Sequence, residues 1–315
     1  MHSDKHKNRQ FEFYTCDVFT NERFGGNQLA VLPNAENLDG TTMQKISREF
    51  NYSETTFVTK SDKSACDFKV RIFTPAEELP FAGHPTLGTA FILAISQMVK
   101  DENHIGETTF ETGIGPVKVQ VHYENKKPVF MRFNINTFAT PEKTSLSKYE
   151  IASAINLQKD DIGAFNLTPV KINFGAVMLM VPLKNIAALE KANINWQVWN
   201  GIISSQNIKV VYLFTQNNKD EKREYSSRMF APELGVNEDP ATGAAAAALG
   251  MFLARFDKDI CYLAHGNFEF TIYQGIQMGR PSRLEVSITK ENGKLSSIDV
   301  GGGAVLVSKG MFLLD

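Results

Sequence analysis

One pattern occurs twice in this 315-residue chain, and it constrains the fold more than any other feature. Both copies read arginine, an apolar residue, phenylalanine, a small residue and proline, first from Arg71 and again from Arg228. Further on, both read a polar residue, proline, two residues, glycine, one residue and alanine, with His84 and Asp239 as the polar residues. The offset between the copies is 157 residues at the arginine and 155 at the polar residue, which predicts a duplicated domain.

Each copy reads as a strand, a short polar loop and a buried helix. Alternating apolar residues that end in proline are typical of a strand that leaves a sheet. The apolar runs at residues 86–98 and 241–255 are long enough, and rich enough in alanine and leucine, to predict buried helices. The first N–H groups of a helix have no partner within it. Two such ends facing each other across a pseudo-twofold axis would form a pocket for an anion or a developing oxyanion.

Prolines and glycines mark the expected start of each helix. Pro85 and Pro240 have the fixed φ and the missing N–H that suit a first helical turn. Gly88 and Gly243 allow the backbone to approach a neighbouring group closely. Both pairs stand at equivalent positions of the repeat, so we expect the two helices to begin alike.

His84 and Asp239, at the polar edge of the two copies, allow two interpretations. In the first, Asp239 only caps its helix and His84 is an ordinary loop histidine. In the second, both residues serve the chemistry of the pocket. The two copies also share the pattern that starts at Arg71 and Arg228, upstream of these residues. Capping a helix does not require that shared pattern, so it favours the second interpretation.

Two polar residues outside the repeat are further candidates. Asn27 follows two glycines in a turn, where it either holds a positive φ or reaches into a cleft. Glu54 stands where a polar loop runs directly into a β-branched strand, and such rigid supports often hold catalytic groups. The alternative for Glu54 is a solvated loop glutamate.

Composition limits the classes of function. The length suits two domains of ordinary size, and a net charge of -2 with no strongly basic half gives no support to nucleic-acid or membrane-surface binding. No apolar segment reaches the roughly 18 residues that span a bilayer, and the polar leader at residues 1–10 lacks the apolar stretch of a signal peptide. Three widely spaced cysteines predict free thiols, a cytoplasmic location and no metal site.

The rest of the chain alternates between short strands and helices. Strands are expected at residues 11–20, 29–32, 68–73, 129–135, 177–181, 210–215, 268–273, 284–288 and 304–307, with two more within 107–121. Helices are expected at residues 41–50, within 141–157 with a start at Ser145 to Ser147, and at 186–192. No Rossmann fingerprint, P-loop, nucleophile elbow or zinc motif is present, so we expect no cofactor.

Several motifs together resemble the PhzF family, which is named for the phenazine-biosynthesis isomerase. They are SETTFV at residues 53–58, PFAGHPTLG at 80–88, EDPATG at 238–243, QG at 274–275, MGRPS at 278–282 and GGAV at 302–305. The resemblance covers about residues 11 to 315, with the motifs in the family's order.

This resemblance implies an α/β (α+β) architecture, the diaminopimelate epimerase-like fold. Such a fold has two pseudo-twofold-related halves, each a curled sheet or barrel around a central helix, with the active site between them. We expect the halves at residues 11–126 and 127–300, and a tail at 301–315 that returns to the first half. The fold is compatible with a homodimer, although the sequence identifies no interface patch.

The resemblance also implies roles for individual residues. Glu54 would be the general acid and base, while His84 and Asp239 would line the pocket and assist proton movement. A substrate-binding role is expected for Asn27, Ser53, Gly83, Gly88, Thr242, Gly243 and Ala244. One carboxylate is chemically enough, because it can take a proton from carbon and return it elsewhere on the same face of a conjugated system.

Three functions remain open at this point. The first is a cofactor-independent isomerase that moves a proton within a small unsaturated, cyclic carboxylic acid. The second is an amino-acid epimerase or racemase of the same fold, although the cysteine pair of those enzymes is absent from the motif positions. The third is a non-catalytic small-molecule-binding protein. Ala244 stands where the phenazine enzymes carry serine, and the missing hydroxyl argues against the phenazine precursor as substrate.

Overall fold

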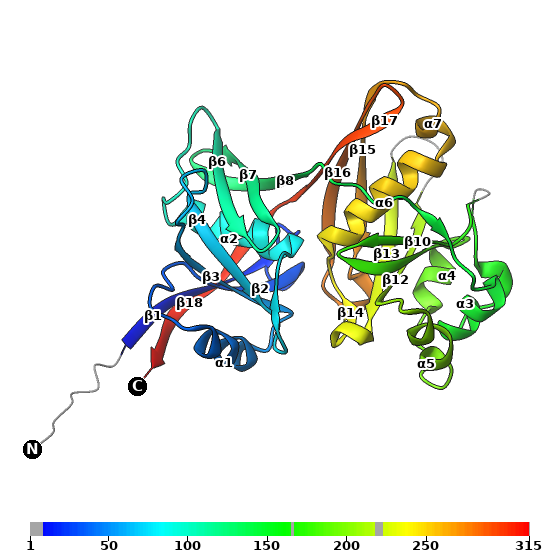
Figure 1. Ribbon diagram of the computed structural model, residues 1–315, viewed down its shortest axis with the longest axis horizontal. Helices are drawn as coiled ribbons and strands as arrows, with labels where there is room; N and C mark the ends of the chain where they lie inside the picture. Colours follow the sequence, from blue (N-terminus) through cyan, green and yellow to red (C-terminus); the bar gives the residue numbers. More distant parts are fainter. Residues whose placement is uncertain (1–8, 165–166, 218–222, 315) are drawn as a thin grey trace, which may run out of the picture. The chain divides into compact units, whose positions relative to one another are not determined.

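The computed structural model describes residues 9–164, 167–217 and 223–314 (Figure 1). Within them the chain divides into two compact units. The first unit combines the chain up to Phe24 with Gln28–Met131 and the chain from Gly303 onward. The second unit consists of Gly25–Asn27 and Arg132–Gly302.

The first unit is a sheet that curls around one helix. Its strands are β1 (Arg9–Val18), β2 (Asn27–Leu32), β3 (Glu54–Lys60), β4 (Phe68–Phe73), β5 (Glu78–Leu79), β6 (Ile105–Thr112), β7 (Gly115–Glu124) and β18 (Ala304–Leu314), with β8 (Lys127–Ile135) leading into the second unit. Its helices are α1 (Gly40–Phe50) and α2 (Gly83–Ile95). Because α2 contacts β1, β3, β7 and β18, it is the central helix of this unit. Strand β18 pairs antiparallel with β1 from Ala304 to Leu314.

The second unit has the same plan with more helices. Its strands are β9 (Glu142–Lys143), β10 (Val170–Phe174), β11 (Ala176–Pro182), β12 (Val210–Gln216), β13 (Glu224–Ala231), β14 (Val236–Asp239), β15 (Gly266–Gln274), β16 (Ser282–Glu291) and β17 (Lys294–Gly302). Its α-helices are α3 (Lys148–Ala154), α4 (Ile186–Lys191), α5 (Trp199–Ile202), α6 (Gly243–Phe256) and α7 (Lys258–Cys261). Four 3-10 turns are η1 (Lys159–Asp161), η2 (Ser204–Gln206), η3 (Pro232–Leu234) and η4 (Ile276–Met278). Helix α6 contacts β10, β11, β16 and β17, which makes it the central helix.

The two units repeat one order of strand pairings. In the first unit β2 is parallel to β3, β3 antiparallel to β4, β4 parallel to β6, and β6 antiparallel to β7. In the second unit β11, β12, β13, β15 and β16 follow the same sequence of directions. A short strand folds back on the repeat strand in each unit, β5 on β4 and β14 on β13. A duplicated domain requires this correspondence.

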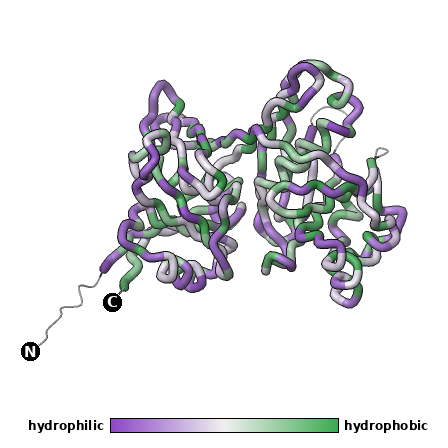
Figure 2. Tube along the Cα trace, viewed as in Figure 1, coloured by the Kyte–Doolittle hydropathy of each residue, from purple (hydrophilic) through white to green (hydrophobic). Residues whose placement is uncertain are grey.

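Burial of α2 and α6 follows from their composition. Both helices are apolar on nearly all sides, so each side chain needs a hydrophobic neighbour (Figure 2). Alanines 245–248 of α6 are fully buried, and their small side chains allow strands to pack closely around the helix. On the opposite sheet faces, α1 buries Met43 and Ile46 in the first unit. In the second unit, α3, α4 and α5 cover the sheet with a cluster that includes the fully buried Trp199.

The structure corrects three details of the sequence analysis. The helix expected within residues 141–157 begins where predicted, since Ser147 caps α3, but it ends at Ala154, and β9 forms at Glu142–Lys143. Strand β17 was missed. Pro85 lies in the first turn of α2, but Pro240 precedes α6, which begins at Gly243. Most of the polar leader, and Asp315 at the end of the predicted tail, lie outside the described residues.

No helix in the described ranges is both long and apolar enough to cross a membrane.

Candidate active site

Glu54 and His84 form a pair within the first unit. Glu54 is the first residue of β3, and His84 is the second residue of α2. Their facing atoms, Glu54 Oε2 and His84 Nε2, are 3.3 Å apart. The side chains are 15% and 6% exposed, so Glu54 is not a solvated loop glutamate. Two residues further along β3, Thr56 bonds to the Thr89 hydroxyl of α2 at 2.8 Å and ties the same strand to the same helix.

The His84 imidazole is neutral at physiological pH. Burial lowers the pKa of His84 from 6.5 to about 3, and a hydrogen bond to the Gln28 backbone acts in the opposite direction. A bond that raises the pKa of an imidazole is donated by the ring, so one nitrogen carries its proton toward the Gln28 backbone. Nε2 then presents a lone pair to Glu54. Their contact is a hydrogen bond when the Glu54 carboxyl carries a proton.

The neighbouring candidates of the first unit have distinct positions. Ser53 is half-buried directly before β3, and Gly83 is the buried first residue of α2. Gly88 lies in the second turn, where a Cβ would come within 2.5 Å of Leu29 Cδ2 and 2.7 Å of Val18 Cγ2. Close packing of α2 on the sheet therefore requires this glycine. A substrate contact of Ser53, Gly83 or Gly88 stays a prediction.

Asp239 is the centre of a buried polar cluster in the second unit. It is the last residue of β14 and 8% exposed. Asn27 Nδ2 donates to Asp239 Oδ1 at 2.9 Å, and the Thr242 hydroxyl donates to Asp239 Oδ2. Gln274 Nε2 donates to the Asp239 backbone carbonyl at 2.7 Å and to Thr242 Oγ1 at 3.1 Å. The structure thus brings together Asn27, Thr242 and Asp239, which the sequence analysis selected separately.

The pKa of Asp239 reflects two opposing effects. Burial raises it from 3.8 to about 6, while the hydrogen bonds from Thr242 and Asn27 lower it. The neighbouring Glu238 charge adds to the rise. Asp239 therefore changes its charge close to neutral pH, which is suited to a group that transfers protons.

Two alternatives from the sequence analysis are wrong. Asp239 does not cap α6, because the N-cap residue is Thr242 and no side chain makes a capping hydrogen bond there. The positive φ of the glycine turn belongs to Phe24 and Gly26, at 72° and 60°, and not to Asn27. Asn27 is instead 1% exposed and uses its side chain for hydrogen bonding.

The first turn of α6 holds the last two candidates. Gly243 is its buried first residue, and Ala244 is half-buried beside it. Gln274, at the end of β15, was missed as an individual site residue. Its only signal in the sequence was its place in the QG motif of the family resemblance.

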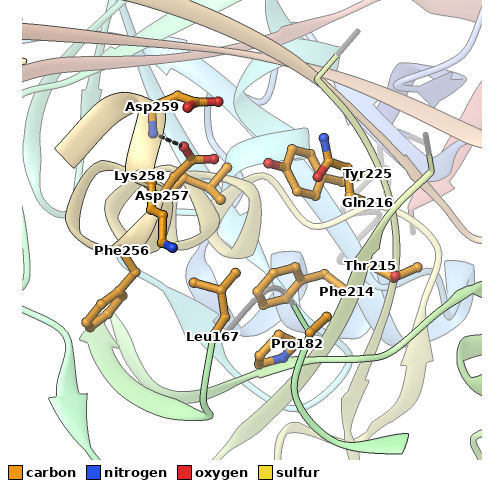
Figure 3. A pocket seen from close by; sticks show the side chains of 12 residues that line it. Leu167, Pro182, Phe214, Thr215, Gln216, Tyr225, Phe256, Asp257, Lys258 and Asp259 are labelled. Atoms are coloured by element: carbon orange, nitrogen blue, oxygen red, sulfur yellow. Dashed lines mark hydrogen bonds between the residues drawn. The ribbon is translucent and has the colours of Figure 1, made fainter. Parts of the chain in front are cut away.

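A separate cavity of about 320 Å³ lies elsewhere in the second unit (Figure 3). Phe214, Tyr225, Phe256 and Lys258 are among the side chains that line it. None of the predicted site residues lines this cavity. Among the described residues, no group of three or more His, Cys, Asp or Glu side chains could hold a metal ion.

Comparisons with known proteins converge on one family. A family described as phenazine biosynthesis-like protein matches residues 16–310. Trans-2,3-dihydro-3-hydroxyanthranilate isomerase of Pseudomonas chlororaphis is 33% identical over 308 residues, covering 96% of this chain and 99% of that protein. A PhzF-family phenazine biosynthesis protein from Bacillus anthracis has a TM-score of 0.85 at 27% identity, over 97% of this chain and all of that one.

A solved structure of much lower sequence identity has a similar fold. A hydroxyproline epimerase from Agrobacterium vitis matches with a TM-score of 0.64 at 12% identity, over 98% of this chain and 93% of that one. Together with the Bacillus anthracis structure, it confirms the mixed α/β, epimerase-like fold.

Proposed function

Because the chain belongs to the family of phenazine biosynthesis-like proteins, we propose that it moves a proton within a small unsaturated, cyclic carboxylic acid, without a cofactor. The relatives named as isomerases confirm the prediction of an isomerase. The observation that carries the finer proposal is the pair of Glu54 and His84, a carboxyl group facing a neutral imidazole across 3.3 Å.

Glu54 is the general acid and base of the proposed reaction. Its carboxylate takes a proton from a carbon next to the unsaturated system, and the electron pair left behind shifts along the conjugated bonds. Glu54 then returns the proton to a carbon further along the system, so that atoms and charges balance. One group serves both steps when the two carbons lie on the same face of the substrate.

His84 stabilises Glu54 while Glu54 carries the proton taken from the substrate. Its Nε2 lone pair accepts a hydrogen bond from Glu54 only while Glu54 holds the substrate proton. Burial keeps the imidazole neutral, so His84 offers this lone pair throughout the physiological pH range. The pair therefore favours protonated Glu54 without fixing the proton permanently on the histidine.

Asp239 is a second proton-transfer group in this proposal, because its pKa of about 6 allows both charge states near neutral pH. Asn27, Ser53, Gly83, Gly88, Thr242, Gly243 and Ala244 are proposed to contact the substrate. The methyl group of Ala244 supplies no hydroxyl, and we therefore propose a substrate other than the phenazine precursor.

The epimerase alternative finds no support in the thiols. Cys16 is buried in the first unit, and burial raises the pKa of its thiol. Cys66 and Cys261 are free and lie outside both clusters. A two-base epimerase that uses cysteines needs a thiol at each reacting face, and neither cluster supplies one.

Solvent-deuterium incorporation tests the proposal. Wild type and Glu54→Gln are incubated in heavy water with cyclic and linear unsaturated hydroxy and amino acids, and NMR follows each carbon. We expect label at a ring or chain carbon with wild type, and a loss of on the order of 10²-fold or more in rate for Glu54→Gln. Glu107→Gln is the matched control, since Glu107 is an exposed glutamate of the same unit that pairs with Lys118. Equal labelling by wild type and Glu54→Gln would contradict the assignment of Glu54.

A further inference from the structure

Asn27 is a donor of fixed orientation. Its Nδ2 atom donates both to Asp239 Oδ1 at 2.9 Å and to the backbone carbonyl of Ala241 at 3.0 Å. A backbone carbonyl only accepts hydrogen bonds, so the NH₂ group of Asn27, and not its amide oxygen, must face Ala241 and Asp239. The Asn27 side chain therefore donates to the Asp239 carboxylate and accepts nothing from it at this contact.

Gln274 fixes the direction of the hydrogen bond between Thr242 and Asp239 by the same argument. Its Nε2 atom donates to the Asp239 backbone carbonyl at 2.7 Å, which identifies the NH₂ side of the amide. The other hydrogen of that NH₂ group points to Thr242 Oγ1, 3.1 Å away. The Thr242 hydroxyl thus accepts from Gln274, and its single proton is directed to Asp239 Oδ2.

Two more hydroxyl groups continue this chain into the core. Gln274 Oε1 accepts from Ser227 at 3.5 Å, and Ser227 accepts from the Tyr212 hydroxyl at 2.9 Å. Gln274 and Tyr212 are fully buried, and Ser227 is 1% exposed. Reversal of the Gln274 amide would break its bonds to both Thr242 and the Asp239 carbonyl, with no solvent to replace them.

We propose that Asn27, Thr242 and Gln274 are positioning residues that hold Asp239 as an oriented proton acceptor, with Gln274 acting on the carboxylate through Thr242. The relevance of this orientation to turnover rests on the proposed function. Both carboxylate oxygens accept hydrogen bonds, Oδ1 from an amide NH₂ group that cannot accept one, and Oδ2 from a hydroxyl whose oxygen already accepts from Gln274. The network therefore favours the ionised form of Asp239, against the cost of burying that charge.

The charged groups around Asp239 in the second unit provide a background that the variants below leave unchanged. Glu238 lies next to Asp239 on β14, and Arg228 of β13 pairs with Glu238. Arg280 donates to the backbone carbonyls of Gly25 and Gly26, just before Asn27. Removal of the uncharged Thr242 hydroxyl consequently breaks its hydrogen bonds with Asp239 and Gln274 without changing any charge near the carboxylate.

Carbon-13 NMR titration of the Asp239 carboxyl carbon tests the inference without any substrate. Asp239→Asn identifies the resonance in wild type labelled with ¹³C-aspartate. We expect Thr242→Val to raise the titration midpoint by on the order of one pH unit, because the carboxylate loses its strongest donor. Thr242→Ser should restore the wild-type midpoint. Thr215→Val is the matched control, since Thr215 is 1% exposed and its hydroxyl has no partner in the described part of the chain.

A double-mutant cycle tests the route through Thr242. Gln274→Met removes the donor without adding a charge, so we expect a smaller rise in the Asp239 midpoint than in Thr242→Val. Thr242→Val/Gln274→Met should show no further shift beyond Thr242→Val, because the effect of Gln274 on the carboxylate passes through the hydroxyl. Additive shifts would overturn this route. A wild-type midpoint in Thr242→Val would overturn the inference as a whole.

The titration and the deuterium experiment separate this inference from the proposed function. If the midpoints shift as expected and no compound exchanges a proton, the orientation of Asp239 is supported and the proposed isomerase chemistry fails. If the wild type turns over a substrate and the Thr242→Val midpoint is unchanged, the positioning role fails alone. With a substrate in hand, the pH profile of kcat/KM should move with the Asp239 midpoint in Thr242→Val.

Discussion

Both copies of the internal repeat use the same arginine-glutamate pair, but in different surroundings. In the first unit Arg71 binds Glu78 through two hydrogen bonds of 2.7 and 2.6 Å, with side chains 28% and 41% exposed. In the second unit Arg228 binds Glu238 through two bonds of 2.8 Å, with exposures of 8% and 17%. Each guanidinium also covers the phenylalanine two residues further on.

Burial changes what the pair does. Arg228 also donates to the backbone carbonyls of Leu189 and Ala192, at the end of α4. It therefore connects α4 to β14 immediately beside Asp239, whereas Arg71 braces a short hairpin near the surface. One sequence pattern thus yields a surface brace in one unit and a buried support for a candidate site in the other.

Loss of the two arginines should have unequal effects on stability. Arg228→Met leaves Glu238 partly buried without its partner and removes the donor to three backbone carbonyls, so we expect a loss on the order of 3 kcal/mol in the free energy of unfolding. Arg71→Met should cost about 1 kcal/mol or less, because water screens and solvates Glu78. Urea denaturation of both variants measures the difference. Similar losses would show that burial does not distinguish the two pairs.

His84 and Asp239, the polar residues at equivalent repeat positions, should give opposite pH dependence of stability. The pKa of His84 falls from 6.5 to about 3 on folding, so the unfolded chain binds more protons and stability declines as the pH falls below about 6.5. The pKa of Asp239 rises from 3.8 to about 6, so the folded chain binds more protons and stability declines as the pH rises from about 4 through 6. Each group contributes up to about 1.4 kcal/mol per pH unit within its window.

Two asparagine variants separate these contributions. His84→Asn should lose less stability than wild type on acidification from pH 6.5 to 4.5. Asp239→Asn should gain stability relative to wild type as the pH rises from 4 to 7. Urea titrations at several pH values measure both differences, and the titrating groups that do not interact with the replaced residue cancel in each comparison. Two differences of the same sign would contradict the assignment.

Local sequence was sufficient for the parts of the fold that depend on local pattern. The apolar runs of α2 and α6, and the position of Glu54 at the start of β3, follow from periodicity, from composition and from a polar loop that meets a β-branched strand. The glycine turn identified Asn27 and the EDPATG motif identified Thr242, but neither indicated that both residues bind Asp239.

Strand pairing between residues far apart in sequence determines the features that local sequence did not predict. Gln274 reaches Asp239 because β15 runs parallel to β13, with Ser226 opposite Tyr273. A contact between residues so far apart in sequence depends on that register and leaves no local pattern. Strand β9, which no local pattern predicted, has a similar cause, since Lys143 of β9 pairs with Val170 of β10. The helix that follows begins where the sequence predicts it, with Ser147 as the N-cap of α3.

The two central helices should respond differently to a single added methyl group. In α2, Gly88→Ala would place a Cβ 2.5 Å from Leu29 Cδ2, so we expect a loss of about 1–3 kcal/mol from overpacking. In α6, Gly250→Ala would place it at 3.4 Å from Ile298 Cδ1, an ordinary contact, and the better helix propensity of alanine should add about 0.5–1 kcal/mol. Thermal and urea unfolding of the two variants measure both signs. Destabilisation by Gly250→Ala would mean that β16 and β17 pack on α6 as tightly as β1 and β2 pack on α2, and the two units would then share one packing constraint around their central helices.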